Sequence, residues 1–359
     1  MLESARNRDR DLPLVFMKED IFDTLINSEF LDLRVGNPQF LQEFWKQDVE
    51  ASNQLWRDTS RIAEELLPQM DYPSQDGDEA LKESIKALHK DHKNVKNIDG
   101  KYIVIANGST QILQATFLAL KQLDNSLNSL YIPEPFWPRL AVMGEFMGLK
   151  YSPFSTVGST INLYTIPNNP DGAVNRLSTA GSNNVLDLNY NWSIYATPIE
   201  NDDGIAIYGI SKLSGFASTR IGWGIFKDKT LADMVSYNVE VLTSGISLDA
   251  QLKAKIILDT ILENKDTFFK FGQDKLIRRH ALLNKLLHDT YVQNRSVRGM
   301  FWLGYSVADL SFLDKAKILY VPGASMVPNN SFKNNFFRIN IGCSDKDFEE
   351  MMRRLKAVL

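Results

Sequence analysis

Short apolar runs separated by amphipathic stretches mark the chain between about residues 80 and 228. The runs predict strands at 102–106, 129–133, 161–166, 184–189, 205–210 and 220–226. Helical stretches such as 112–120 alternate with these strands, so we expect a mainly parallel sheet between layers of helices. Two longer stretches, 238–262 and 265–287, predict helices that lead into a smaller α/β region with strands at 299–303 and 337–341.

Composition and charge narrow the classes of protein. Of 359 residues, 44% are hydrophobic, and 40 basic against 44 acidic residues give a formal net charge of −4. No basic stripe is present, so nucleic acid is not an expected partner. The first residues are charged, and no run approaches the roughly 20 apolar residues of a membrane span. We therefore expect a cytoplasmic protein with no membrane partner.

The cysteine and histidine residues indicate neither a disulfide nor a metal site. Cys343 is the single cysteine, which excludes an intrachain disulfide, and the four histidines lack further ligands nearby. His89 and His92 stand three apart at a charged helix end. We expect them to be solvated and not a metal pair.

The most informative segment, 211–224, sets Lys212 eight residues before Arg220 across a turn of small residues. A lysine amine can form a Schiff base with an aldehyde, and the planar fork of an arginine matches a phosphate. The pair therefore suits pyridoxal phosphate, which carries both groups. A lysine and an arginine at this spacing also occur on solvated surfaces, so the pattern alone leaves that alternative open.

Two earlier segments fall in the order that such a site needs. Gly108, Ser109 and Thr110 follow the predicted strand 102–106 and open an apolar helix, and a helix start with free N–H groups and hydroxyls can bind an anion. An ordinary N-cap would look the same. Trp137 follows the strand 129–133 and is placed either to stack on a pyridine ring or to fill the core.

Three later segments complete the order. Asn169 lies in the turn Asn-Pro-Asp-Gly after strand 161–166, which turn chemistry alone would explain. Asp187 ends an apolar strand, where burial requires a cationic partner such as a protonated pyridine nitrogen; an Asx-turn is the alternative. Arg338 interrupts an apolar strand and could bind a substrate carboxylate, or pair with a surface acid from an edge strand.

The succession Gly-Ser-Thr, aromatic, Asn-Pro-x-Gly, Asp-x-x-Tyr, Ser-Lys, Arg and a late Arg resembles the fold-type I pyridoxal phosphate aminotransferase superfamily. Segments 211–223 and 243–252, and Gly36-Asn37-Pro38 with Phe44-Trp45, are similar to the branch of plant alliinases and tryptophan aminotransferases. The resemblance implies a large domain, 46–255, with a mainly parallel seven-stranded sheet between helices, and a smaller α/β C-terminal domain, 256–359. It also implies that 1–45 packs on the small domain.

The resemblance also assigns roles. Lys212 would form the Schiff base and move the substrate α-proton, Asp187 would pair with the pyridinium, and Arg338 would clamp the substrate carboxylate beside Gly36 and Asn37. The remaining cofactor-binding residues would be Asn169 and Tyr190 at the ring hydroxyl, Trp137 stacked on the ring, Gly108, Ser109, Thr110, Ser211 and Arg220 at the phosphate, and Tyr72 reaching the phosphate of a neighbouring subunit. A homodimer with composite active sites follows from the role of Tyr72.

Two positions depart from the superfamily pattern. Gly209, three residues before Lys212, stands where aminotransferases often have a residue whose hydroxyl group binds the phosphate. Ser211 or Ser218 are candidates to supply this hydroxyl instead. Met326 stands where an aromatic is common, which affects substrate fit.

The resemblance implies an aminotransferase that moves an amino group from an L-amino acid, with an aromatic donor as first guess, to a 2-oxo acid by ping-pong kinetics. An alliinase-like carbon–sulfur lyase, or another enzyme of β or γ elimination or replacement, shares every cofactor contact. The chain lacks the cysteine-rich N-terminal extension of plant alliinases, which favours transamination. A non-catalytic pyridoxal phosphate-binding protein is the third hypothesis, although Lys212 and Asp187 are both present.

Overall fold

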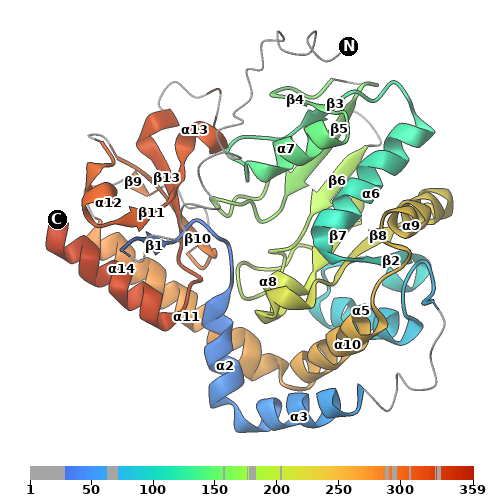
Figure 1. Ribbon diagram of the computed structural model, residues 1–359, viewed down its shortest axis with the longest axis horizontal. Helices are drawn as coiled ribbons and strands as arrows, with labels where there is room; N and C mark the ends of the chain where they lie inside the picture. The colour runs from blue at the N-terminus through green and yellow to red at the C-terminus, as the bar shows by residue number, and fades with distance from the viewer. Residues whose placement is uncertain are drawn as a thin grey trace.

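The computed structural model describes residues 29–62, 72–156, 158–175, 177, 183–202, 204–287, 291–292, 297–306, 309–327, 329 and 333–359. Its larger part is a seven-stranded sheet of order β2-β8-β7-β6-β5-β3-β4 (Figure 1). The strands are β2 (Tyr102–Ala106), β3 (Ser129–Tyr131), β4 (Lys150–Ser152), β5 (Thr160–Thr165), β6 (Asn184–Asp187), β7 (Ile205–Gly209) and β8 (Gly222–Phe226).

Most of the sheet is parallel, as the sequence predicts. β4, β3, β5, β6 and β7 pair in parallel, and β8 runs antiparallel between β7 and β2. Because β2 and β7 both oppose β8, they point the same way. Every residue of β5, β7 and β8 is buried, which is why β7 and β8 read as apolar runs without alternation. β5 also buries the polar residues Thr160, Asn162 and Thr165.

Helices with side-chain caps cover the sheet. α5 (Glu79–His92) and α9 (Lys229–Thr243) begin where the Asp78 and Asp228 carboxylates accept from backbone N–H groups three residues on. The other helices of this part are α6 (Gly108–Leu123), α7 (Arg139–Phe146), α8 (Ile210–Ser214) and α10 (Leu248–Glu263). α6 packs against α9 and β8, and α10 packs against α5.

The continuous helix predicted over 238–262 is wrong. α9 ends at Thr243 and α10 begins at Leu248. Between them Ser244 and Gly245 have φ angles of 53° and 100°, which no α-helix accommodates. The second predicted helix is confirmed as α11 (Lys265–Leu286).

The smaller part contains the antiparallel sheet β12-β13-β10-β9 and a two-stranded parallel sheet, β1-β11. Its strands are β1 (Leu31–Asp32), β9 (Tyr291–Val292), β10 (Phe301–Tyr305), β11 (Ile318–Leu319), β12 (Val321–Pro322) and β13 (Phe336–Asn340). Its helices are α12 (Ser311–Lys315), α13 (Gly323–Met326) and α14 (Asp345–Val358), beside α11. The strands predicted at 299–303 and 337–341 correspond to β10 and β13.

The N-terminal segment reaches this smaller sheet before crossing to the larger part. β1 pairs with β11, and the Asn340 N–H donates to the Leu33 carbonyl. The chain then forms α2 (Gln42–Gln47) and α3 (Val49–Ser60), and α3 lies against α10. Residues 1–28 are outside the described part, and the boundaries at 45 and 255 stay predictions.

The histidines correct one expectation. His89 is fully buried and its two ring nitrogens contact Asn94 Oδ1 at 2.7 Å and Trp223 Nε1 at 3.0 Å. The His92 side chain is 5% exposed. The prediction that both are solvated is therefore wrong, because this face of α5 packs on aromatic residues, including Tyr208 of β7 and Trp192 of the segment after β6. Within the described ranges, no group of three or more potential metal ligands gathers.

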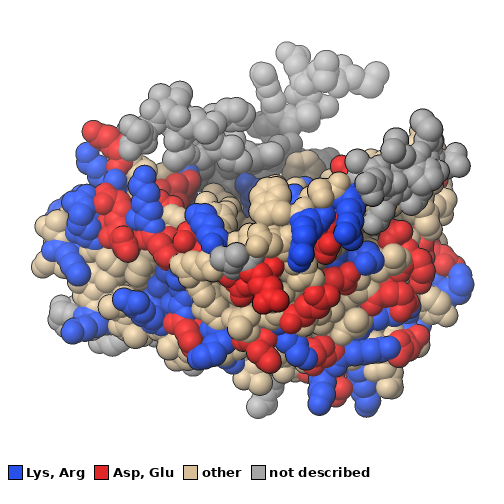
Figure 2. All heavy atoms as spheres, turned by 90° about the horizontal axis from the view of Figure 1, so that it is seen from below, with Lys and Arg blue, Asp and Glu red and all other residues tan. Residues whose placement is uncertain are grey.

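The surface in Figure 2 mixes acidic and basic side chains without a continuous field of one sign on the face shown. Among the described helices, none combines the length and apolar character needed to cross a bilayer.

Candidate active site

The ends of five strands bring the predicted residues to one edge of the large sheet. β2, β5, β6 and β7 point their carboxyl ends there, and the antiparallel β8 begins there. At or next to these ends lie Gly108 at the start of α6, Asp187 at the end of β6, Lys212 in α8, and Asn169 and Arg220 in loops. Open α/β sheets bind ligands at such an edge.

A tight backbone cup forms where α6 begins. Gly108 has a φ of +80°, and a Cβ added there would lie 2.4 Å from Arg220 Nη2. A Cβ at Gly222 would lie 2.3 Å from the Ser109 nitrogen. Glycine is therefore required at both positions for the turn, the arginine and β8 to meet. No side chain caps the first turn of α6, so its N–H groups remain for an anion.

Arg220 lies at the rim of this cup. Its Nη1 donates to the Ala217 carbonyl at 2.9 Å and to Ser211 Oγ at 3.3 Å. No ion pair joins Arg220 to a carboxylate in the described part of the chain. Ser109 is half-buried and Thr110 is exposed. The Arg220 guanidinium, these two hydroxyls and the N–H groups of α6 lie together, and no described carboxylate pairs with Arg220.

Asp187 occupies the buried centre of the edge. Its Oδ1 accepts from Asn189 Nδ2 at 2.6 Å and from the Asn189 N–H at 3.2 Å. Burial raises the pKa of this carboxyl, while the Asn189 contacts and the charge of Lys212 act in the opposite direction. Sequence reasoning missed Asn189, although the spacing Asp-x-Asn is a signal for an Asx-type turn.

Lys212 projects from α8, and no acid of the described ranges is in hydrogen-bonding contact with it. Its Nζ donates to the Gly36 carbonyl, and the Tyr195 hydroxyl donates to the Lys212 carbonyl at 2.6 Å. Burial lowers the pKa of Lys212 to about 8; Asp187 raises it, and the charge of Arg338 adds to the lowering. A lysine with such a pKa holds a proton that it can exchange near neutral pH. Tyr195 carried no sequence signal.

Arg338 lies in the centre of the small antiparallel sheet, 2% exposed, and not on an edge strand. Its Nη1 donates to Asn169 Oδ1 at 3.0 Å, and Nη2 donates to the Arg34 carbonyl. Its guanidinium lies 4.2 Å from the Phe301 ring centroid. Burial lowers the pKa of Arg338 to about 10. The alternative of a surface acid partner is therefore wrong.

Four predicted residues lie near Arg338 and Lys212. Asn169 Nδ2 donates to the Tyr190 hydroxyl at 3.5 Å, and burial raises the pKa of Tyr190. Asn37 and Gly36 lie in the segment whose carbonyls contact Asn340 and Lys212. The buried Asn37 Oδ1 and Arg338 Nε have no hydrogen-bond partner among the residues that the structure describes.

Two predicted residues stand apart from these contacts. Trp137 is half-buried and packs against the hydrophobic core. Tyr72 is 86% exposed, next to Pro73, which lies beside Gly245. Met326 is buried with Leu303 and Val321.

The residues present fit pyridoxal phosphate. The N–H cup with Arg220 matches the phosphate, Lys212 matches the aldehyde, and the buried Asp187 carboxyl matches a protonated ring nitrogen. The unpaired Nε of the buried Arg338 matches a further anionic group, because a buried donor without a partner is costly.

Comparison with known proteins agrees with a site for pyridoxal phosphate. Residues 31–297 match the allinase family. Tryptophan aminotransferase-related protein 4 of Arabidopsis thaliana is 27% identical over 279 residues, which cover 71% of this chain and 58% of that protein. Alliin lyase 2 of Allium sativum is 27% identical over 282 residues, which cover 71% and 56%. The chain thus spans less than two thirds of the length of these relatives.

The fold has solved counterparts. Aspartate aminotransferase from Thermus thermophilus, solved with maleate, superposes with a TM-score of 0.73 at 16% identity, covering 92% of both chains. This likeness establishes the fold as that of fold-type I aminotransferases. Since the family match spans most of the residues described, the chain belongs to the allinase family, whose cofactor is pyridoxal phosphate.

Proposed function

We propose that this protein is a pyridoxal phosphate-dependent aminotransferase that moves an amino group from an L-amino acid to a 2-oxo acid. The observation that carries the proposal is the arrangement of Lys212, with its pKa lowered to about 8, beside the buried carboxyl of Asp187 and the buried Arg338. An aromatic donor, tryptophan first, is suggested by the similarity to the tryptophan aminotransferase-related proteins of Arabidopsis thaliana.

When bound, pyridoxal phosphate supplies an aldehyde for the amine and a ring that accepts charge from the substrate α-carbon. Asp187 keeps a proton on the ring nitrogen, and Asn169 and Tyr190 bind the ring hydroxyl oxygen. Lys212 Nζ takes the proton from the substrate α-carbon and returns it. Arg338, with Gly36 and Asn37 nearby, orients the substrate by its carboxylate.

The phosphate is held by the Gly108 turn, Ser109, Thr110, Ser211 and Arg220 in this proposal, while Trp137 stacks on the ring. Tyr72, exposed in one chain, reaches the phosphate of a second copy. The functional unit is then a two-fold dimer with composite sites, and sedimentation of the active enzyme tests this part.

A carbon–sulfur lyase is the second candidate, favoured by the similarity to alliin lyase 2. Mixing the loaded protein with a panel of amino acids, without any oxo acid, separates the two. An aminotransferase converts its cofactor stoichiometrically to the pyridoxamine form and stops. A lyase turns over repeatedly and releases ammonia, and that result would overturn the aminotransferase proposal.

Asp187→Ala tests the shared part of both candidates. Loss of the carboxylate removes the partner of the ring nitrogen, so turnover falls far more than the free energy of unfolding changes. A fully active Asp187→Ala enzyme would show that the ring nitrogen is not held by this residue.

A further inference from the structure

Asn189 lies between the two halves of the proposed cofactor site. Through Nδ2 and its backbone N–H it donates twice to Asp187 Oδ1, at 2.6 and 3.2 Å. Its own Oδ1 points to Gly209, at the end of β7, where an added Cβ would lie 2.9 Å away. Asn189 is 6% exposed, so its carboxamide is held within this gap.

The backbone at position 209 does not require glycine. Gly209 has φ −164° and ψ 150°, an extended conformation that any residue adopts. The other nearest atoms to the added Cβ are the Ile221 carbonyl oxygen and Ser109 Cβ, both at 3.6 Å, which is ordinary contact. The Asn189 carboxamide is therefore the group that excludes a side chain from position 209.

We propose that Asn189 is a positioning residue that fixes the Asp187 carboxyl. Gly209 has no side chain and so leaves the space that the Asn189 carboxamide occupies. The two residues form a coupled pair. A side chain at 209 would have to displace the Asn189 carboxamide, and Asp187 would then lose its shortest hydrogen bond. The inference rests on the proposed function in one respect, namely that Asp187 faces the ring nitrogen.

The pair of Asn189 and Gly209 explains why glycine stands at position 209, where the superfamily pattern often has a hydroxyl residue. A hydroxyl residue at position 209 would stand beside Ser109, where the proposed phosphate site lies. In this chain the Asn189 carboxamide fills the space beside Gly209 instead, and it donates a hydrogen bond to the Asp187 carboxylate. A hydrogen bond to a charged acceptor is stronger than one between neutral groups. With Asn189 in place of a hydroxyl at position 209, the protein therefore binds the cofactor less through its phosphate and more through the carboxylate that faces its ring nitrogen.

Four proteins test the coupling: the wild type, Asn189→Ala, Gly209→Ser and the double variant. We measure the cofactor dissociation constant of each by absorbance titration and the thermal unfolding of each apoprotein. Each single variant should weaken cofactor binding by about tenfold or more, the size expected for losing a charge-assisted hydrogen bond. Gly209→Ser in the Asn189→Ala background should instead tighten binding, because the space is then free and a hydroxyl reaches the phosphate.

Gly100→Ser is the matched control, because an added Cβ there meets nothing within 4 Å. It should leave cofactor binding unchanged in both backgrounds. If Asn189→Ala does not fold, Asn189→Ser replaces it in the cycle. Additive effects of the Asn189 and Gly209 changes would overturn the proposal, since a coupled pair requires non-additivity.

An analogue of pyridoxal phosphate with C–H in place of the ring nitrogen separates positioning from general structural support. Asn189→Ala should weaken binding of pyridoxal phosphate and leave binding of the analogue unchanged. Equal weakening of both ligands would overturn the positioning role. If the wild type itself binds both ligands equally, the proposed role of Asp187 fails, and this outcome is distinct from additivity in the cycle.

Discussion

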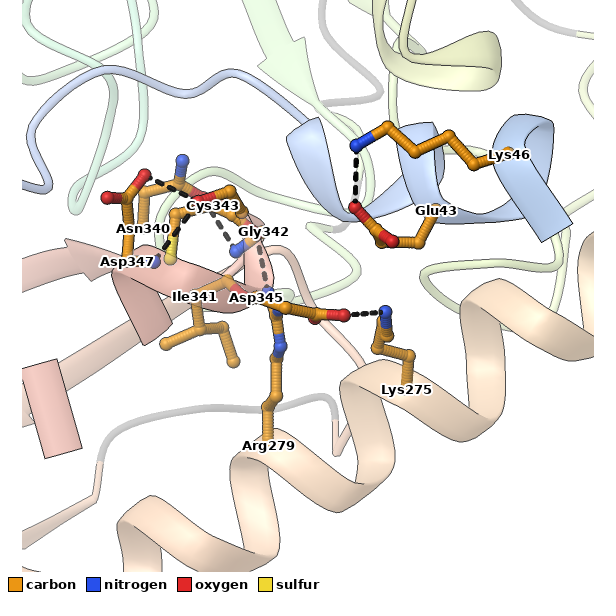
Figure 3. A network of polar contacts seen from close by, with 11 residues as sticks. Glu43, Lys46, Lys275, Arg279, Asn340, Ile341, Gly342, Cys343, Asp345 and Asp347 are labelled. Carbon is orange, nitrogen blue, oxygen red and sulfur yellow. Dashed lines mark hydrogen bonds and ion pairs between the residues drawn. The ribbon is translucent and has the colours of Figure 1, made fainter. Parts of the chain in front are cut away.

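Two buried arginines of the smaller sheet region make a direct comparison. Arg338 is 2% and Arg279 is 3% exposed, and each lies over a phenylalanine ring, at 4.2 and 4.7 Å respectively. Arg279 reaches from α11 to the turn after β13, as Figure 3 shows, and donates to the carbonyls of Ile341 and Cys343. It also pairs with Asp345.

The difference lies in charge compensation. Asp345 binds both Arg279 and Lys275, whereas no described carboxylate pairs with Arg338, whose Nε is unsatisfied. A buried cation without an anion is costly. We infer that Arg279 serves the fold and that Arg338 keeps its charge for a ligand.

The lysines extend the comparison and give the largest expected effect. Within the described residues the half-buried Lys212 donates only to a carbonyl, while the buried Lys82 pairs with Asp76 at 2.6 Å. Lys212→Ala should reduce turnover to background and prevent covalent attachment of the cofactor. Borohydride reduction followed by peptide mapping checks this, with Lys82→Ala as the control that keeps the label at Lys212. Labelling of another lysine would contradict the assignment.

Arg338→Ala comes next. Removing the carboxylate partner should cost about 2–5 kcal/mol of substrate binding, which is roughly thirtyfold to several thousandfold in kcat/KM. Relief of the uncompensated charge should leave the melting temperature unchanged or raise it. Arg338→Lys should not restore activity, because an ammonium lacks the planar fork. A large loss of stability with unchanged kcat/KM would reverse the roles inferred for the two arginines.

Arg279→Met should show the opposite pattern. The Asp345 side chain is 42% exposed, so the loss in free energy of unfolding should lie near the lower end of the range for broken buried pairs, about 3 kcal/mol. Urea denaturation measures this loss. The kcat/KM of the folded fraction should stay within about twofold of the wild type, the scatter expected for a residue remote from the reaction.

The strands and the residues at their ends could be predicted because a buried parallel strand is a continuous apolar run and the polar residue that follows it stands out. Asp187, the last residue of β6, is of this kind, and Lys212 lies in α8 directly after β7. Arg338 stood out for another reason, as a charged residue inside an apolar strand. The Asn189 hydrogen bonds to Asp187 have a local signal in the sequence, but the fit of Asn189 against Gly209 and the contact of Tyr195 with the Lys212 carbonyl become visible only once the chain is folded. The break at Ser244 and Gly245 was missed because two residues with positive φ leave the apolar pattern on either side intact.

The prediction that His89 is solvated is wrong because the sequence did not reveal which face of a charged helix is buried. His89 lies on α5 among lysines and acids, yet its ring is sandwiched between Trp192 and Tyr208. The charged neighbours describe the outer face of the helix, and the period that would place His89 on the inner face runs through Leu81, Ile85 and Leu88.

A substitution of His89 should have the smallest effect at neutral pH. It extends the comparison of buried charged residues, because His89 is a buried titratable group that stays neutral. Burial lowers its pKa to about 3, and Trp223 Nε1 donates to its Nε2, which requires that nitrogen to be unprotonated. The unfolded chain binds a proton near pH 6.5. Between about pH 3 and 6.5 the unfolded state therefore holds more protons than the folded state at this residue.

Under this condition the free energy of unfolding rises with pH, by up to about 1.4 kcal/mol per pH unit from His89. The contribution is fully present above pH 6.5 and is lost as pH falls toward 3. His89→Gln should flatten this part of the pH profile, measured by urea denaturation at pH 5 and pH 7, while its profile above pH 7 stays parallel to that of the wild type. An unchanged slope between pH 5 and 7 would show that His89 accepts a proton in the folded protein, and that a buried charge here, as at Arg338, is tolerated without an anionic partner.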